Sequence, residues 1–253
     1  MKKQFLIITA IIAAALFSCT KEKIETPPAA TESFESISKP VIQLDPLSIG
    51  LDGWFKFNGN LADATGKLPN GTPNISGALA YTTDRKGNAN SAIKFTGRYG
   101  IDITSIPYGT SKSVCAWVKY GATVAWPACR YLWKTNEPSP NIAQSENKYS
   151  AVISGDTSLA AVESNPLDGN WHFLVATYDG TTMNFYVDGS FAGSVVNAFT
   201  GVYPPGFTST FHVGYFPVEN STQIIGTWYG SMDDVRFYNR VLSASEVNKL
   251  SHL

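Results

Sequence analysis

The sequence is poor in the residues that mark several large classes of protein. Charged residues make up only 15% of its 253 residues, and Lys and Arg form no cluster, so a nucleic-acid-binding surface is not expected. No apolar run approaches the roughly 20 residues that cross a bilayer as a helix. Only three histidines occur, and the strings Gly-x-Ser-x-Gly, His-Glu-x-x-His and the phosphate loop are all missing. We therefore expect no familiar hydrolase, metalloprotease or nucleotide-binding site.

A glycosidase site is also not expected. The retaining mechanism needs two carboxylates about 5 Å apart, and no Glu-x-Asp-x-Glu string supplies them from one strand. The adjacent Asp233 and Asp234 are expected to point to opposite faces of a strand. His172, His212 and His252 are interpreted as structural histidines rather than catalytic bases. The protein is therefore predicted not to be an enzyme.

The N-terminus has the pattern of an export signal. Lys2 and Lys3 precede a 13-residue apolar run from Phe5 to Phe17, which is too short to span a bilayer. The run closes on Leu-Phe-Ser-Cys, which resembles a bacterial lipobox and implies that residues 1–18 are removed and Cys19 is lipidated. Thr20 is not the aspartate of an inner-membrane retention signal, and "KEKIE" resembles the start of surface-exported lipoproteins of Bacteroidetes. An outer-membrane lipoprotein, exposed at the cell surface, is predicted.

The chain beyond the signal divides into two parts. Residues 19–43 are rich in Thr, Lys, Glu, Ser and Pro, and are predicted to form a flexible tether. Residues 44–253 are predicted to form one domain, in which short alternating strings such as "SVCAWVKY", "HFLVATYDG", "MNFYVDG" and "DDVRFYN" indicate strands. Asp179-Gly180 is expected to turn a hairpin, and Ser243 with Glu246 to cap a short C-terminal helix. The fold class is therefore all-β.

Four strings in this order resemble one family. They are "LDGWFKFNGNLADATGK", "DRKGNANSAIKFTGRYGIDI", "WHFLVATYDGTTMNFYVDGSFAGS" and "GSMDDVRFYNRVLSASEV", and they are similar to the laminin-G-like jelly-roll domains of the pentraxin and concanavalin A-like group. This resemblance implies a two-sheet antiparallel β-sandwich. Trp54, Trp117, Trp133, Trp171 and Trp228 are expected to fill its core.

Within such a sandwich, binding is the expected task. Sugar rings stack on loop aromatics, so Trp126, Tyr203 and Phe207 are the candidate carbohydrate contacts; the alternative is that they only cover an edge of the fold. The function predicted first is a non-catalytic carbohydrate-binding surface lipoprotein. The alternatives are an adhesion or protein-interaction module whose partner is a surface protein and, third, an enzyme acting on glycosides.

The sequence also suggests a metal site and a disulfide. The resemblance implies that Asp233 ligates a structural Ca²⁺ ion, with Asp63 as a second ligand. The alternative is that both carboxylates accept hydrogen bonds from backbone amides of turns. Cys115 and Cys129 are separated by an expected hairpin, so they are predicted either to form a disulfide or to remain buried free thiols.

Overall fold

The structure of the protein is a computed structural model. It describes residues 45–75, 79–97, 99–107, 109, 112–121, 130–135, 140–145, 148–154, 159–164, 167–196, 206–217, 224–225 and 227–253. The chain from Gln43 to Leu253 clusters as one compact unit. No helix in the part of the chain that the structure describes is long and apolar enough to cross a membrane.

The first sheet contains the four strings that were most clearly strand-like. In spatial order it consists of β13 (Ser190–Val196), β12 (Thr182–Val187), β11 (Trp171–Tyr178), β6 (Lys112–Tyr120), β17 (Tyr229–Tyr238), β4 (Ala92–Thr96) and β3 (Ala80–Thr82), and β1 (Leu51–Phe55) also pairs with β17. All these pairings are antiparallel. The strand predictions for this sheet are confirmed.

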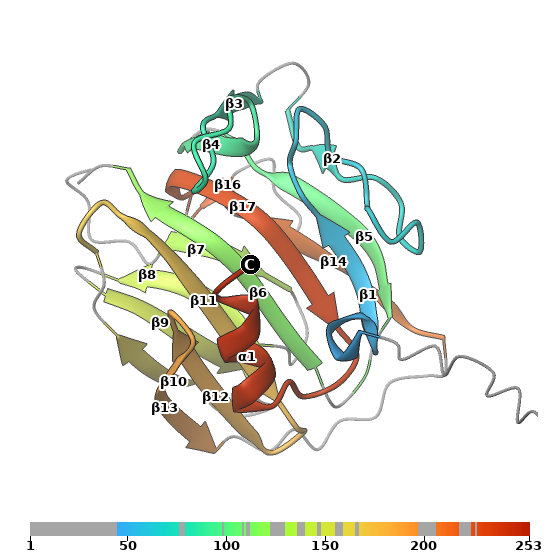
Figure 1. The fold of residues 1–253 in the computed structure, drawn as a ribbon, viewed down its shortest axis with the longest axis vertical. Coiled ribbons are helices and arrows are strands. Elements are labelled where there is room, and N and C mark those ends of the chain that lie inside the picture. The colour runs from blue at the N-terminus through green and yellow to red at the C-terminus, as the bar shows by residue number, and fades with distance from the viewer. Residues whose placement is uncertain are drawn as a thin grey trace, which may run out of the picture. The chain divides into compact units, whose positions relative to one another are not determined.

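The second sheet lies against the first (Figure 1). Its spatial order is β10 (Leu159–Ser164), β9 (Lys148–Ser154), β8 (Asn141–Ser145), β7 (Arg130–Lys134), β14 (Thr208–Val213), β5 (Ile101–Pro107) and β2 (Thr72–Pro73). A separate two-stranded ladder joins β15 (Phe216–Pro217) to β16 (Ile224–Ile225). The prediction of a two-sheet antiparallel sandwich is confirmed.

The core between the sheets comes from alternate residues of each strand. On β11, Leu174 and Ala176 face the second sheet, while Phe173 and Val175 face the opposite way. Trp133 and Trp228 are fully buried in this core, as expected. The core expectation is wrong for the other three tryptophans that were assigned to it, because Trp54, Trp117 and Trp171 are only partly buried.

A second apolar layer covers the outer face of the first sheet. The C-terminal helix α1 (Ala244–Leu250) places Val247 and Leu250 against Phe173, Val175 and Cys115, and Figure 1 shows α1 lying across β6 and β11. The predicted capping box is present. The Ser243 hydroxyl accepts a hydrogen bond from the Glu246 amide, and the Glu246 carboxylate accepts one from the Ser243 amide at 2.8 Å.

The predicted hairpin is confirmed. Strands β11 and β12 pair through a turn in which the Asp179 amide donates to the carbonyl of Thr182 at 3.2 Å. Gly180 has φ of +100°, which a residue without a Cβ adopts without strain. The Asp179 carboxylate accepts the amides of Thr181 and Thr182 at 2.8 and 2.7 Å. The turn therefore fixes the connection between β11 and β12 in the first sheet.

Candidate functional site

The structure describes one of the three predicted carbohydrate contacts. Phe207 is 36% exposed and immediately precedes β14. Trp126 and Tyr203 lie outside the described residues, as does the predicted lipidation residue Cys19. The strand ends that flank Trp126 are the last residue of β6 and the first of β7. The pocket described next lies at the opposite ends of these two strands.

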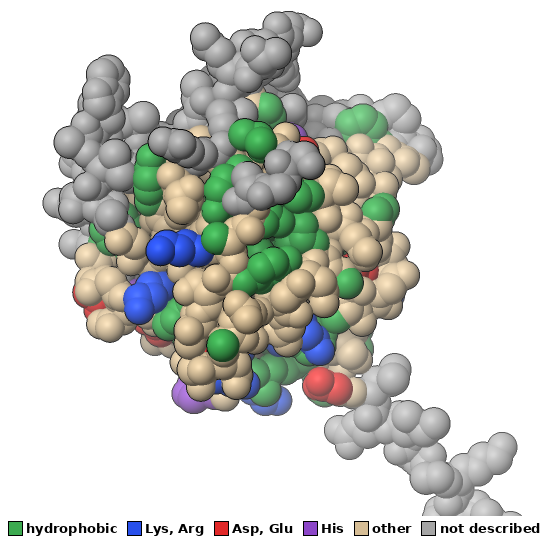
Figure 2. Space-filling view, turned by 90° about the horizontal axis from the view of Figure 1, so that it is seen from above, with side chains coloured by type: hydrophobic (Ala, Val, Ile, Leu, Met, Phe, Trp, Pro, Cys, Tyr) green, Lys and Arg blue, Asp and Glu red, His purple; other side chains and the backbone are tan. Residues whose placement is uncertain are grey.

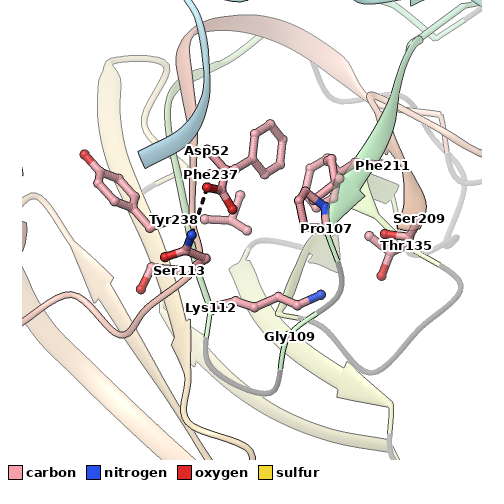
Figure 3. Close-up of a pocket in the computed structure, with 13 residues that line it drawn as sticks. Asp52, Pro107, Gly109, Lys112, Ser113, Thr135, Ser209, Phe211, Phe237 and Tyr238 are labelled. Carbon is pink, nitrogen blue, oxygen red and sulfur yellow. Dashed lines mark hydrogen bonds between the residues drawn. The ribbon is translucent and has the colours of Figure 1, made fainter. Parts of the chain in front are cut away.

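A pocket of about 260 Å³ opens between the two sheets at one end of the sandwich (Figure 3). The ends of six strands meet there: β1, β6 and β14 begin at the pocket, and β5, β7 and β17 end at it. Thr208, the first residue of β14, pairs with Pro107, which lines the pocket. Phe207 precedes Thr208 in the chain and therefore lies beside this wall of the pocket. No sequence motif predicts this site, because its residues come from segments far apart in the chain.

The inner part of the pocket is apolar. Phe211 of the second sheet and Phe237 of the first contact each other with ring centroids 4.6 Å apart and planes at 83°. Val114 and Ile106 complete this floor, and all four side chains are buried. Such a surface suits the C–H face of a sugar ring or another apolar group, because it contributes area without unpaired polar atoms.

Polar side chains surround the apolar floor. The Asn239 amide donates to Asp52 at 2.9 Å, and burial raises the pKa of Asp52, while the charge of Lys67 and this hydrogen bond lower it in part. Lys112 is buried, and its side chain extends from β6 toward the wall formed by the second sheet (Figure 3). Ser209 and Thr135 lie on that second wall. The pocket therefore combines an apolar floor with groups that donate hydrogen bonds and groups that accept them.

Asp63, the second predicted calcium ligand, is occupied by protein donors. Its carboxylate accepts the amides of Trp54, Thr65, Lys67 and Leu68 and the hydroxyl of Thr65, at distances from 2.6 to 3.1 Å. Burial would raise the pKa of Asp63, but these hydrogen bonds lower it below its ordinary value. The carboxylate thus holds the turn after β1, which is the alternative that the sequence had left open.

Asp233, the first predicted ligand, belongs to an ion-pair network on the outer face of the first sheet. One guanidinium, that of Arg85, contacts both Asp233 and Asp234, the latter at 3.1 Å. Arg236 also binds Asp234 at 3.1 Å. Burial raises the pKa of Asp233 to about 7, against the lowering effect of the Arg85 charge. The same network includes the Trp54 indole N–H, which donates to Asp234.

The expectation that Asp233 and Asp234 point to opposite faces is wrong. A β-bulge interrupts the pairing of β17 with β6 between Asp233 and Arg236, and Asp234 adopts a φ of +58°. The extra residue turns the strand locally, so both carboxylates reach the same guanidinium. The carboxylates of Asp233 and Asp234 therefore lie close together, but both form ion pairs with arginine side chains.

This donor set does not fit calcium. A Ca²⁺ ion takes six to eight oxygen ligands, whereas the carboxylate of Asp63 is bound by amides and that of Asp233 by a guanidinium. Among the described residues, no group of three or more His, Cys, Asp or Glu side chains is placed to hold a metal ion.

The premise of the predicted disulfide is wrong. Strands β6 and β7 do not form a hairpin, since they belong to different sheets. Cys115 is a free thiol on the outer face of β6, fully buried beneath α1, and burial raises its pKa to about 12. Cys129 lies outside the described residues, so its pairing stays a prediction that the position of Cys115 does not favour.

The histidines make the structural contacts that were expected. His172 bridges Asp188 at 2.7 Å and Asp168 at 2.9 Å. Burial alone would lower its pKa, but the two carboxylates raise it above the ordinary value. His212 binds Asp102 at 2.7 Å, and His252 contacts the carbonyl of Asn248 in the last turn of α1. None of the three lines the pocket.

The surface agrees with the absence of basic clusters in the sequence. Figure 2 shows hydrophobic side chains gathered near the centre of one face, while Lys and Arg side chains that the structure describes are few there and do not merge into one patch.

These features place the protein in a defined family. Residues 88–248 match the family described as the concanavalin A-like lectin/glucanases superfamily, and the chain belongs to it. The laminin-G-like resemblance seen in the sequence is thereby confirmed. No curated protein matches the sequence.

Solved structures share the fold at low identity. Domain 4 of AbnA, a GH43 extracellular arabinanase from Geobacillus stearothermophilus in complex with arabinotriose, is 21% identical with a TM-score of 0.62, covering 79% of this chain and 98% of that one. The binding domain of botulinum neurotoxin DC in complex with SialylT is 15% identical with a TM-score of 0.62, covering 81% of this chain and 52% of that one. The binding domain of Paraclostridial Mosquitocidal Protein 1 is 12% identical with a TM-score of 0.61, covering 80% and 52%.

Proposed function

We propose that the protein is a non-catalytic, glycan-binding lipoprotein of the bacterial outer membrane. The observation that carries this proposal is the pocket at the end of the sandwich, in which an aromatic floor is surrounded by Asp52, Lys112 and Asn239. Sugars present the matching chemistry, because each ring has apolar C–H faces and a rim of hydroxyls.

The neighbours of known structure support a sugar ligand. Domain 4 of the arabinanase is in complex with arabinotriose, and the neurotoxin binding domain is in complex with SialylT. Catalysis is not proposed, since the two acids that the β-bulge brings together are bound by Arg85 and Arg236. Lipid on Cys19 and a flexible stretch up to residue 43 would hold the binding domain at the cell surface, where it would retain glycan for partner proteins.

A glycan array probed with the purified mature protein tests the binding function. We expect retention of at least one neutral oligosaccharide class, and Phe207→Ala should weaken it roughly threefold to tenfold through lost ring contact. Phe207 directly precedes Thr208, which pairs with the pocket residue Pro107. Phe191→Ala is the matched control, because Phe191 is 59% exposed on β13, an edge strand of the first sheet that contributes no residue to the pocket. Retention of no glycan would refute the binding function, and release of shortened sugars from a retained glycan would refute the non-catalytic assignment.

The anchor is tested separately. Cells fed a radiolabelled fatty acid should label the wild-type protein in the outer-membrane fraction, and Cys19→Ser should abolish the label and release the protein from that fraction. Labelling that persists in Cys19→Ser would contradict the proposed anchor. This result would leave the glycan-binding assay unaffected.

A further inference from the structure

The pocket is closed at its inner end. Stacked sheets lie about 10 Å apart, and the space between them at this point is filled by Phe211 and Phe237, which are 1% and 3% exposed. Their edge-to-face contact leaves no passage from the pocket into the sandwich. A polymer that entered from the open side could not leave through the other side.

A residue within a glycan chain carries neighbours on two sides, whereas a terminal residue carries a neighbour on one side only. A closed pocket therefore admits only a terminus. Resting on the proposed function, we propose that the pocket binds the terminal residue of a neutral glycan chain, which enters end first. The volume agrees with this, because about 260 Å³ lies just below the 300–1,000 Å³ typical of sites for drug-sized ligands.

The wall of the pocket offers one unused hydrogen-bonding group. Ser209 is 8% exposed, and its hydroxyl is buried without a hydrogen-bond partner in the protein. Figure 3 shows Ser209 beside Thr135, on the wall formed by the second sheet. An unpaired buried hydroxyl is unfavourable, and rotation of the Ser209 side chain toward the pocket would let a hydroxyl of the inserted sugar residue satisfy it. Ser209 thus gives the terminal residue a specific contact that the apolar floor cannot supply.

The charge of the pocket favours an uncharged terminus. Its lining contains one ammonium group, on Lys112, and one carboxylate, on Asp52, so that the formal charges cancel. An acidic sugar would bring a carboxylate toward a partly buried Asp52 and would lose its own hydration. Glycans ending in a uronic acid are therefore expected to bind more weakly than their neutral counterparts.

The number of chain ends in a polysaccharide sample can be varied at constant mass. The probes are linear arabinan, xylan, glucan and mannan, each split by partial hydrolysis into samples of equal mass and decreasing mean length. For whichever polymer the mature protein retains, the amount of protein bound per milligram should rise in proportion to the number of chain ends. A bound amount that stays constant or falls as the chains shorten overturns end-first binding and leaves glycan binding standing. Retention of none of the polymers overturns the proposed function itself.

Variants at Ser209 test the location. Ser209→Ala should weaken binding about tenfold, equivalent to about 1.4 kcal/mol, with no loss of thermal stability. Ser209→Met should fill the pocket and abolish binding. The matched control is Thr177→Val, since Thr177 is fully buried with an unpartnered hydroxyl but does not line the pocket. Unchanged affinity in a folded Ser209→Met protein would overturn the assignment of the ligand to this pocket.

Discussion

Removing the guanidinium of Arg85 should strongly destabilise the domain. Asp233 and Asp234 are 3% and 7% exposed, and Arg85 contacts both. Arg85→Met retains much of the aliphatic stem but removes the guanidinium, whose carbon lies 4.9 Å from the centroid of the Trp117 ring. Breaking a buried ion pair by removing one partner costs about 3–5 kcal/mol. Because the Arg85 side chain is 12% exposed, we expect a loss of about 3 kcal/mol, or roughly 6–12 °C in Tm.

The loss should depend on pH in a defined direction. Burial already raises the pKa of Asp233 to about 7 in the folded protein, well above the value of about 4 in an unfolded chain. Removing Arg85 raises that pKa further, so the folded variant binds the proton more tightly than the wild type does. A raised carboxyl pKa costs stability as pH increases toward it. The deficit of the variant should therefore be larger at pH 8 than at pH 5.

Thermal unfolding followed by circular dichroism at both pH values measures this deficit. Lys86→Met is the matched control, because the neighbouring Lys86 is exposed and lines the same surface depression without an ion pair to Asp233 or Asp234. The control should keep the Tm of the wild type. The reasoning is refuted if Arg85→Met unfolds at the wild-type temperature at pH 8, or if its deficit is greater at pH 5.

Three further results are expected. In urea unfolding, Gly97→Ala should lose about 1–3 kcal/mol more stability than Gly66→Ala. Both positions have positive φ, but only a Cβ at position 97 would meet another side chain, the ring of Tyr229, at 2.0 Å. Equal losses would contradict the predicted clash. His172→Gln should be destabilised at pH 6 relative to the wild type, and the difference should shrink by pH 9 as the native imidazolium loses its proton; a difference independent of pH would exclude a charged bridge. Added Ca²⁺ or a chelator should leave Tm unchanged, and a rise of several degrees with Ca²⁺ would show that the acidic groups do take the ion.

The fold could be predicted because its signals are local. Period-2 strings, the Asp179-Gly180 turn and the Ser243 cap each depend on residues within a few positions of one another, and all three appear in the structure. The pocket could not be predicted in this way, since Asp52, Lys112 and Ser209 meet only when distant strands end at the same place.

The errors also have physical causes. Alternation along a strand predicted opposite directions for Asp233 and Asp234, but a bulge with a non-glycine residue at positive φ leaves no clear pattern in one sequence. Tryptophans were assigned to the core by size, yet the first sheet also has a half-covered outer face where Trp54 lies between Lys56 and Arg236. Side-chain chemistry alone does not reveal which face of a sheet a ring occupies.

The pairing of β1 with β17 has a consequence for the newly made chain. Leu51 lies opposite Tyr238, so the first strand of the domain finds its partner only near the end of the sequence. A polypeptide emerging from the ribosome carries that strand unpaired until almost all of it has been synthesised, and contacts so distant in sequence form slowly. The topology itself therefore delays closure of the first sheet until β17 has been made.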